Sequence, residues 1–160
     1  MAQKAGERLA QDKSFSPTHI YSSPYTRTIS TAAEIRKSYP ETELVLEPLI
    51  SEYQSLFSHH TAMHPRGIPT DYRGTPTGFS YPEGTDAFRR RVDFIVDKLI
   101  KKHNTDLLIV AHGAVINWLI ERLVGEAPEY VHYLGTVTFQ TADGEIVPGS
   151  AHYSCSPMEM

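Results

Sequence analysis

The chain has 160 residues, enough for one domain with a hydrophobic core and too few for two. Its 15 basic and 19 acidic residues give a net charge of −4, and no apolar run is as long as a membrane span, which argues against nucleic acid or a membrane as the main partner. The single cysteine excludes a disulfide framework and a thiolate metal site, so we expect a reducing, cytoplasmic setting.

The first third of the chain predicts two helices and two strands. Residues 18–21 and 43–47 are expected to be short strands, because each is rich in apolar and β-branched or aromatic side chains. A helix is expected to run from the turn after the first strand to about Ser38, and Pro40 ends it. Residues 1–12 predict a further helix, since four small or apolar side chains share one face: Ala2, Ala5, Leu9 and Ala10.

Residues 54–82 are polar and aromatic, and prolines and glycines interrupt them repeatedly. A stretch of that length with little periodicity is typical of a functional lid or binding loop inside a compact domain. It contains His59, His60 and His64, but no carboxylates or cysteines stand at ligand spacing beside them. We therefore expect no metal site and no other cofactor.

The second half predicts two helices around one buried strand. Thr85 is expected to cap a helix whose apolar residues repeat at helical spacing. Residues 107–111 are continuously apolar, as expected for the buried middle of a parallel sheet. The next helix is predicted over residues 114–124, ending before Gly125.

The end of the chain predicts a last strand at residues 135–140 and a turn at Asp143-Gly144. The residues after Pro148 are expected to be loosely held. No internal repeat or second domain is evident, so residues 1–160 are interpreted as one domain. Strands that alternate with helices predict an α/β fold.

The turn between the first strand and its helix is the first candidate for binding. Ser23 suits the N-cap and Pro24 the first helical position, which places Arg27 in the first turn. The positive end of a helix dipole disfavours a cation and favours an anion, so an arginine there indicates a negatively charged ligand beside it, and a guanidinium fork fits a phosphate. The alternative is a surface arginine that merely follows a capped turn.

Two further residues follow predicted strands. His112 lies where residues 107–111 give way to a helix, a place where open α/β sheets bind ligands, and Gly113 lets the backbone approach an anion closely. Glu52 follows the second strand, and a carboxyl group beside a bound phosphate tends to have a raised pKa, which suits a general acid. The alternatives are a histidine that only caps the sheet and an ordinary exposed acid.

Three segments together resemble the histidine phosphatase superfamily, whose members are similar to phosphoglycerate mutase. They are residues 22–27 (SSPYTR) with the following Thr31-Ala32, residues 49–52 (LISE) and residues 110–113 (VAHG). The resemblance implies a three-layer fold with a mostly parallel sheet between helices. It also implies that Arg27 and His112 hold the phosphoryl oxygens of a phosphate ester or phosphoprotein, and that Glu52 protonates the leaving oxygen.

One family feature does not occur in the 160 residues. Members carry a nucleophilic histidine in an Arg-His-Gly motif at the end of the first strand, and no Arg-His-Gly is found here. The resemblance therefore implies an N-terminally truncated domain without that strand and with little or no phosphatase activity. The unpaired sheet edge favours a homodimer.

The alternative is a catalytically dead module that binds a phosphorylated ligand or a partner protein. A serine hydrolase and a dinucleotide site are unsupported, since neither Gly-x-Ser-x-Gly nor Gly-x-Gly-x-x-Gly occurs.

Overall fold

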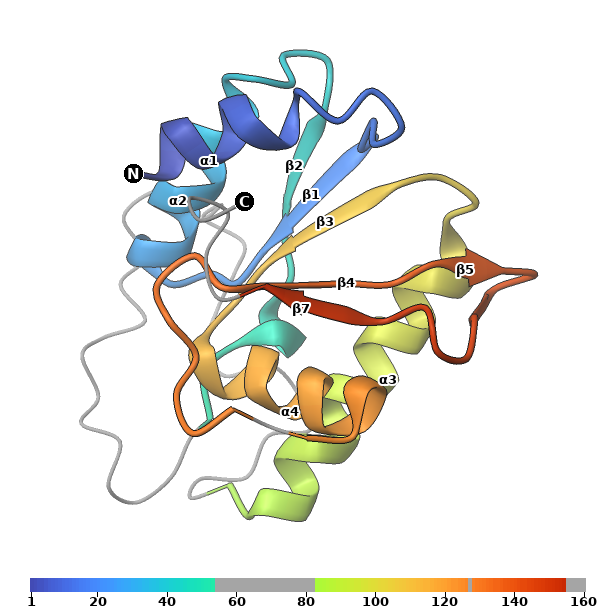
Figure 1. Ribbon diagram of the computed structural model, residues 1–160. Helices are drawn as coiled ribbons and strands as arrows, with labels where there is room; N and C mark the ends of the chain where they lie inside the picture. Colours follow the sequence, from blue (N-terminus) through green and yellow to red (C-terminus); the bar gives the residue numbers. More distant parts are fainter. Residues whose placement is uncertain (54–82, 127, 155–160) are drawn as a thin grey trace.

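A computed structural model of the protein describes residues 1–53, 83–126 and 128–154. The predicted lid at residues 54–82, with its three histidines, lies outside the described residues. Three parallel strands form the main sheet in the order β2-β1-β3 (Figure 1), and these strands are β1 His19–Ser22, β2 Glu43–Leu46 and β3 Leu107–Val110. Ser22 lies opposite Leu46 on one side and Val110 on the other, so all three strands end at the same edge of the sheet.

Helices cover both faces of this sheet (Figure 1). On one face lie α1 Ala2–Leu9 and α2 Thr26–Arg36, and on the other lie α3 Thr85–Lys102 and α4 Gly113–Val124. Successive strand residues point to opposite faces, so Ile20 packs against α2 whereas Tyr21 packs against α3. The predicted α/β architecture with a parallel sheet between helices is confirmed.

The packing of α1 on α2 depends on one glycine. A Cβ atom added to Gly6 would lie 2.9 Å from the Cα and from the carbonyl oxygen of Ile35, closer than side chains pack. Ile35 belongs to the buried cluster that α2 forms against β1 and β3. Gly6 therefore lets α1 cover the helix that carries Arg27.

The C-terminal strands form two small antiparallel sheets. β4 Thr136–Thr138 pairs with β7 His152–Ser154, and β5 Thr141–Ala142 pairs with β6 Glu145–Ile146. The predicted Asp143-Gly144 turn is confirmed, with φ values of 53° and 76°. The expectation of a loosely held chain after Pro148 is wrong for β7, because its backbone pairs with β4. Among the described residues, β3 pairs with β1 and with no second strand.

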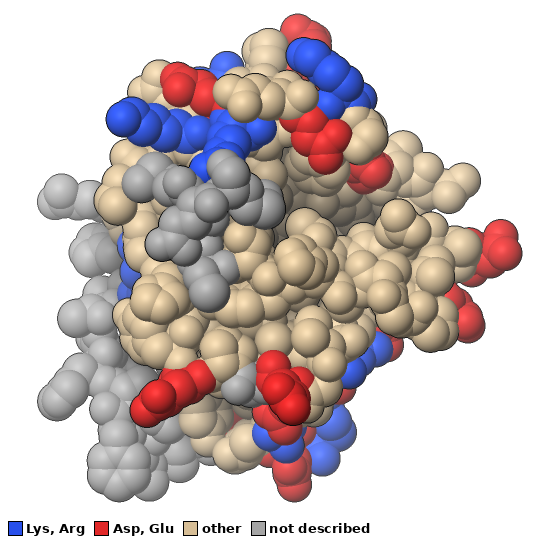
Figure 2. All heavy atoms as spheres, viewed as in Figure 1, with Lys and Arg blue, Asp and Glu red and all other residues tan. Residues whose placement is uncertain are grey.

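The surface over β4 and β7 consists mainly of uncharged side chains (Figure 2). Basic and acidic side chains lie together near α1 and around α3 and α4 on this face, so charges of both signs are interspersed. None of the helices in the described ranges has an apolar stretch long enough to span a bilayer.

Two predicted helix caps are wrong, and for the same reason. The N-cap of α2 is Tyr25 rather than Ser23, and the N-cap of α3 is Gly84 rather than Thr85. The Ser23 hydroxyl is hydrogen-bonded to His112 and the Thr85 hydroxyl to Tyr53, so neither caps a helix. Tertiary partners compete with local capping for these short side chains.

Candidate functional site

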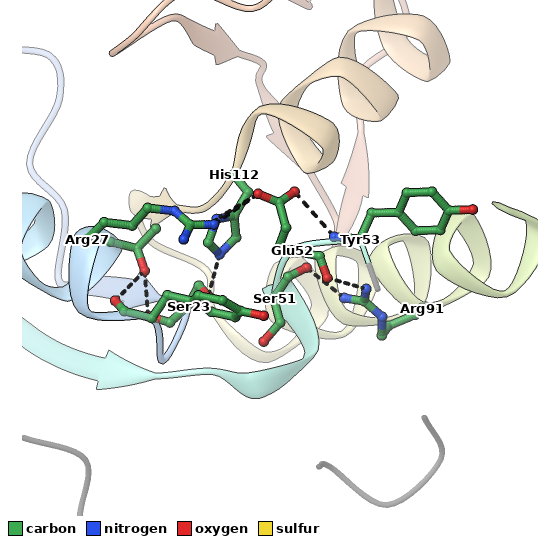
Figure 3. Close-up of polar contacts among 9 residues, drawn as sticks. Ser23, Arg27, Ser51, Glu52, Tyr53, Arg91 and His112 are labelled. Atoms are coloured by element: carbon green, nitrogen blue, oxygen red, sulfur yellow. Dashed lines mark hydrogen bonds and ion pairs between the residues drawn. The ribbon is translucent and has the colours of Figure 1, made fainter. Parts of the chain in front are cut away.

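Three successive strands each bring one side chain to the same edge of the sheet (Figure 3). Arg27 is the second residue of α2, which follows β1, and His112 is the N-cap of α4, which follows β3. Glu52 follows β2 through the short 3-10 helix η1 Pro48–Ile50. The carboxyl ends of parallel strands are where α/β sheets bind their ligands, and the three residues predicted from the sequence meet there.

Arg27, Glu52 and His112 form a close cluster. Nη2 of Arg27 lies 3.0 Å from Oε2 of Glu52 and 2.9 Å from Nδ1 of His112. The distance from Nδ1 of His112 to the same Glu52 oxygen is 3.3 Å. The His112 side chain is 1% exposed, whereas those of Arg27 and Glu52 are 51% and 30% exposed. The cluster is therefore a buried imidazole beneath an ion pair that solvent reaches.

Ser23 holds the other side of the His112 ring. Its hydroxyl lies 2.7 Å from Nε2 of His112, and Ser23 itself is fully buried. The Ser23 amide donates to the carbonyl of Val110, which ties the end of β1 to the end of β3. The ring is thereby oriented with Nδ1 toward Arg27 and Glu52 (Figure 3).

The hydrogen-bond roles of the two His112 ring nitrogens differ between the neutral and the doubly protonated ring. A guanidinium group only donates, so a neutral ring accepts from Arg27 at Nδ1 and donates from Nε2 to the Ser23 hydroxyl. A doubly protonated ring donates from Nδ1 to Glu52. Nδ1 therefore donates to an anion beside Arg27 only when the ring is doubly protonated.

Ser23 contacts His112, which in turn contacts Glu52, as in a hydrolase triad, but the burial of Ser23 excludes that chemistry. A serine nucleophile must meet the carbonyl of its substrate, and Ser23 is 0% exposed. Its hydroxyl therefore orients the imidazole rather than attacking a substrate.

Tyr25 is a site residue that the sequence reasoning missed. Its ring packs edge-on against His112 at 4.8 Å between centroids, and the Arg27 guanidinium lies 4.7 Å from the centre of the same ring. The Tyr25 residue is 8% exposed. It packs against the imidazole and supports the arginine through a cation–π contact. The only sequence signal is its place between Ser23 and Arg27.

The pKa of Glu52 lies below its ordinary value in this state. Burial raises it, but the hydrogen bond and the charge of His112, the amide of Tyr53 and the charge of Arg27 together outweigh burial. The raised pKa predicted from the sequence applies to a Glu52 carboxyl beside a bound phosphate, whereas here the carboxylate is itself the anion that the two basic groups contact.

Gly113 is the first residue of α4, and a Cβ atom there would meet nothing within 4 Å. No neighbouring atom therefore requires a glycine at this position, and the role of Gly113 as a phosphate contact stays a prediction. No set of three or more His, Cys, Asp or Glu side chains within residues 1–53, 83–126 and 128–154 is arranged to hold a metal ion.

A family model described as the histidine phosphatase superfamily (branch 1) matches residues 1–143. A relative named an uncharacterized phosphoglycerate mutase family protein, from Acanthamoeba polyphaga mimivirus, is 40% identical over 146 residues. That alignment covers 88% of this chain and 71% of the viral protein.

Solved structures share the fold at low sequence identity. Phosphoglycerate mutase from Bacillus anthracis str. Sterne has a TM-score of 0.69 at 18% identity, covering 98% of this chain and 79% of its own. YhfR of Bacillus stearothermophilus has a TM-score of 0.63 at 16% identity, covering 92% and 80%. Mycobacterial glucosyl-3-phosphoglycerate phosphatase has a TM-score of 0.60 at 16% identity, covering 98% and 83%.

Proposed function

Because the chain belongs to the histidine phosphatase superfamily, we propose that the cluster of Arg27, Glu52 and His112 binds the phosphoryl group of a phosphate ester or a phosphoprotein. The observation that carries the proposal is the convergence of two basic groups on one carboxylate oxygen. Nη2 of Arg27 and Nδ1 of His112 lie 3.0 Å and 3.3 Å from Oε2 of Glu52. A phosphoryl oxygen in that position receives the same two contacts when the His112 ring is doubly protonated.

In this proposal the Glu52 carboxylate is displaced when the ligand binds. The carboxylate then loses the charges of Arg27 and His112 that lower its pKa, and it gains an anionic neighbour, which raises the pKa. Glu52 thus takes up a proton, as a general acid that protonates a leaving oxygen must. Ligand binding and proton uptake are coupled through this one residue.

Lineage supports phosphomonoester hydrolysis or phosphoryl transfer, but we propose that these 160 residues bind such esters without turning them over. The family reaction uses a nucleophilic histidine in an Arg-His-Gly motif, which does not occur in the sequence. His112 is a poor substitute, because Ser23 occupies its Nε2 and Arg27 its Nδ1. A binding module for phosphorylated small molecules or proteins is therefore the favoured form of the function.

Calorimetric titration with tungstate, an inert dianion that resembles phosphate, tests the binding. The wild type is expected to bind, and Arg27→Met or His112→Ala to weaken binding roughly ten- to hundredfold, since each removes a charge-assisted contact. Arg89→Met is the matched control, because Arg89 pairs with Glu121 on the surface of α3 and α4. A folded wild type that binds no tungstate contradicts the proposal.

Hydrolysis of p-nitrophenyl phosphate tests the second part. We expect no turnover above buffer by the wild type. Turnover that persists through purification and disappears in His112→Ala would show that these residues are a phosphatase after all.

A further inference from the structure

A buried arginine lies behind Glu52, on the side away from Arg27 (Figure 3). Arg91 projects from α3, and its side chain is 7% exposed. Its Nε and Nη2 donate to the two carboxylate oxygens of Glu83 at 2.8 Å and 2.7 Å, and the Glu83 side chain is 3% exposed. Such a bidentate pair fixes the plane of the guanidinium group.

Arg91 also contacts the backbone that carries Glu52. Nη1 donates to the carbonyl oxygens of Leu49 and Ser51 at 2.7 Å and 3.1 Å, and Nη2 lies 3.4 Å from the carbonyl oxygen of Glu52. A planar fork with five N–H groups can hold several acceptors at fixed angles, which a lysine ammonium cannot.

Packing fixes the start of this backbone, because Ile50 is fully buried in a cluster with Tyr21, Ile95 and Leu99. Ser51 and Glu52 follow η1 and lie outside the sheet, so no strand ladder sets the place of Glu52. The amide and the hydroxyl of Ser51 both donate to the carbonyl oxygen of Pro48. Tyr53 adds one further contact with α3, since its ring lies 5.0 Å from that of Phe88. Glu83 lies on the far side of residues 54–82 in the chain, so Arg91 joins the two ends of that segment.

We infer that Arg91, fixed by Glu83, is a positioning residue that holds the Glu52 carboxylate against Arg27 and His112. The inference rests on the proposed function, because it assigns Arg91 to the control of the same anion site. Oε2 of Glu52 contacts both basic groups within 3.3 Å, and loss of the backbone clamp lets it move away from them. The carboxylate then titrates as an ordinary glutamate.

The test is a carbon-13 NMR titration of the Glu52 carboxyl group in ligand-free protein, in the wild type and in Arg91→Lys. The wild-type pKa is expected below the ordinary glutamate value, and that of Arg91→Lys shifted upward toward it. Lysine keeps the charge beside Glu83 but lacks the fork. A Glu52 titration in folded Arg91→Lys that matches the wild type overturns the inference.

Two further variants separate positioning from folding. Arg91→Gln/Glu83→Gln removes both charges together, so no unpaired charge is buried, and it is expected to shift the Glu52 titration as Arg91→Lys does. An unshifted titration in this folded variant also overturns the inference. Arg89→Met, two residues away on α3, is expected to leave the Glu52 titration unchanged. An equal shift of the Glu52 pKa in Arg89→Met would show that any charge lost from α3 has this effect, and it would overturn the role of Arg91.

Tungstate titration of the same proteins distinguishes the two proposals. A wild type with a lowered Glu52 pKa that binds no tungstate contradicts the proposed function, while the NMR comparison still decides the role of Arg91. If tungstate binds, Arg91→Lys is expected to lose part of the pH dependence of the affinity. An unchanged pH dependence counts against the inference.

Discussion

The Ser23 hydroxyl lies 2.7 Å from Nε2 of His112, and both residues are buried. The contact joins the end of β1 to the end of β3 across 89 residues of sequence. It presents Nδ1 of the ring to Arg27 and Glu52, so the arrangement of the cluster depends on a fully buried serine.

Ser23→Ala is expected to lower the free energy of unfolding by about 1–3 kcal/mol, because it leaves a buried ring nitrogen without its partner. Denaturant unfolding measures this cost, and nitrogen-15 NMR of the imidazole reports the loss of a single tautomer. Ser22→Ala is the matched control, since the equally buried Ser22 hydroxyl donates to a backbone carbonyl. An unaltered imidazole spectrum in Ser23→Ala would contradict the assigned role.

Glu52→Gln is expected to bind tungstate on the order of tenfold more tightly than the wild type near neutral pH. The variant lacks the carboxylate charge that the ligand must displace, and a charge-assisted contact of about 1.4 kcal/mol corresponds to that factor. The gain should shrink as the pH falls and the wild-type carboxylate takes up its proton. Glu121→Gln, which removes a surface carboxylate paired with Arg89, should bind as the wild type does.

The stability of the wild type is expected to depend on the ionisation of Glu52. The folded-state pKa is below its ordinary value, so the carboxylate contributes stability above the ordinary pKa of about 4.5, and this contribution is lost as the pH falls through the folded-state pKa. Urea unfolding of the wild type and Glu52→Gln should therefore differ most near neutral pH and converge in acid. A constant difference across this range would contradict the assignment.

Glu83→Ala is expected to destabilise the protein by about 3–5 kcal/mol, since it leaves the Arg91 charge buried without its partner. Thermal and denaturant unfolding measure the loss. Glu121→Ala breaks a pair whose side chains are 38% and 42% exposed, and it should cost no more than about 1 kcal/mol. An equal loss of unfolding free energy in the two variants would show that burial does not determine how much the Glu83–Arg91 pair stabilises the protein.

Gly6→Ala is expected to lower the free energy of unfolding by about 1–3 kcal/mol, because the new methyl group would overlap the backbone of Ile35. Gly113→Ala places the same methyl group in open space at the start of α4, and stability should change by less than about 1 kcal/mol. If both variants unfold alike, close approach of α1 and α2 is not the reason for the glycine.

Much of the fold was predictable because its signals are local. The helical spacing in residues 85–102 and the unbroken apolar run before His112 each depend on neighbours within a few positions, and the structure has a helix and a strand there. The cap assigned to Ser23 failed because a partner 89 residues away takes its hydroxyl. The strand β7 was missed because its pairing with β4 is a contact between distant segments.

By itself, the sequence determined that Arg27, Glu52 and His112 would meet, since each follows a strand whose carboxyl end must lie at one edge of a parallel sheet. Only the tertiary structure decided how these side chains are held. Arg91 sits three residues after Phe88 on the apolar face of α3, a signal that a charged group is buried there, but its bonds to the Glu52 segment span about 40 residues. Such contacts depend on how packed elements meet, which no local spacing encodes.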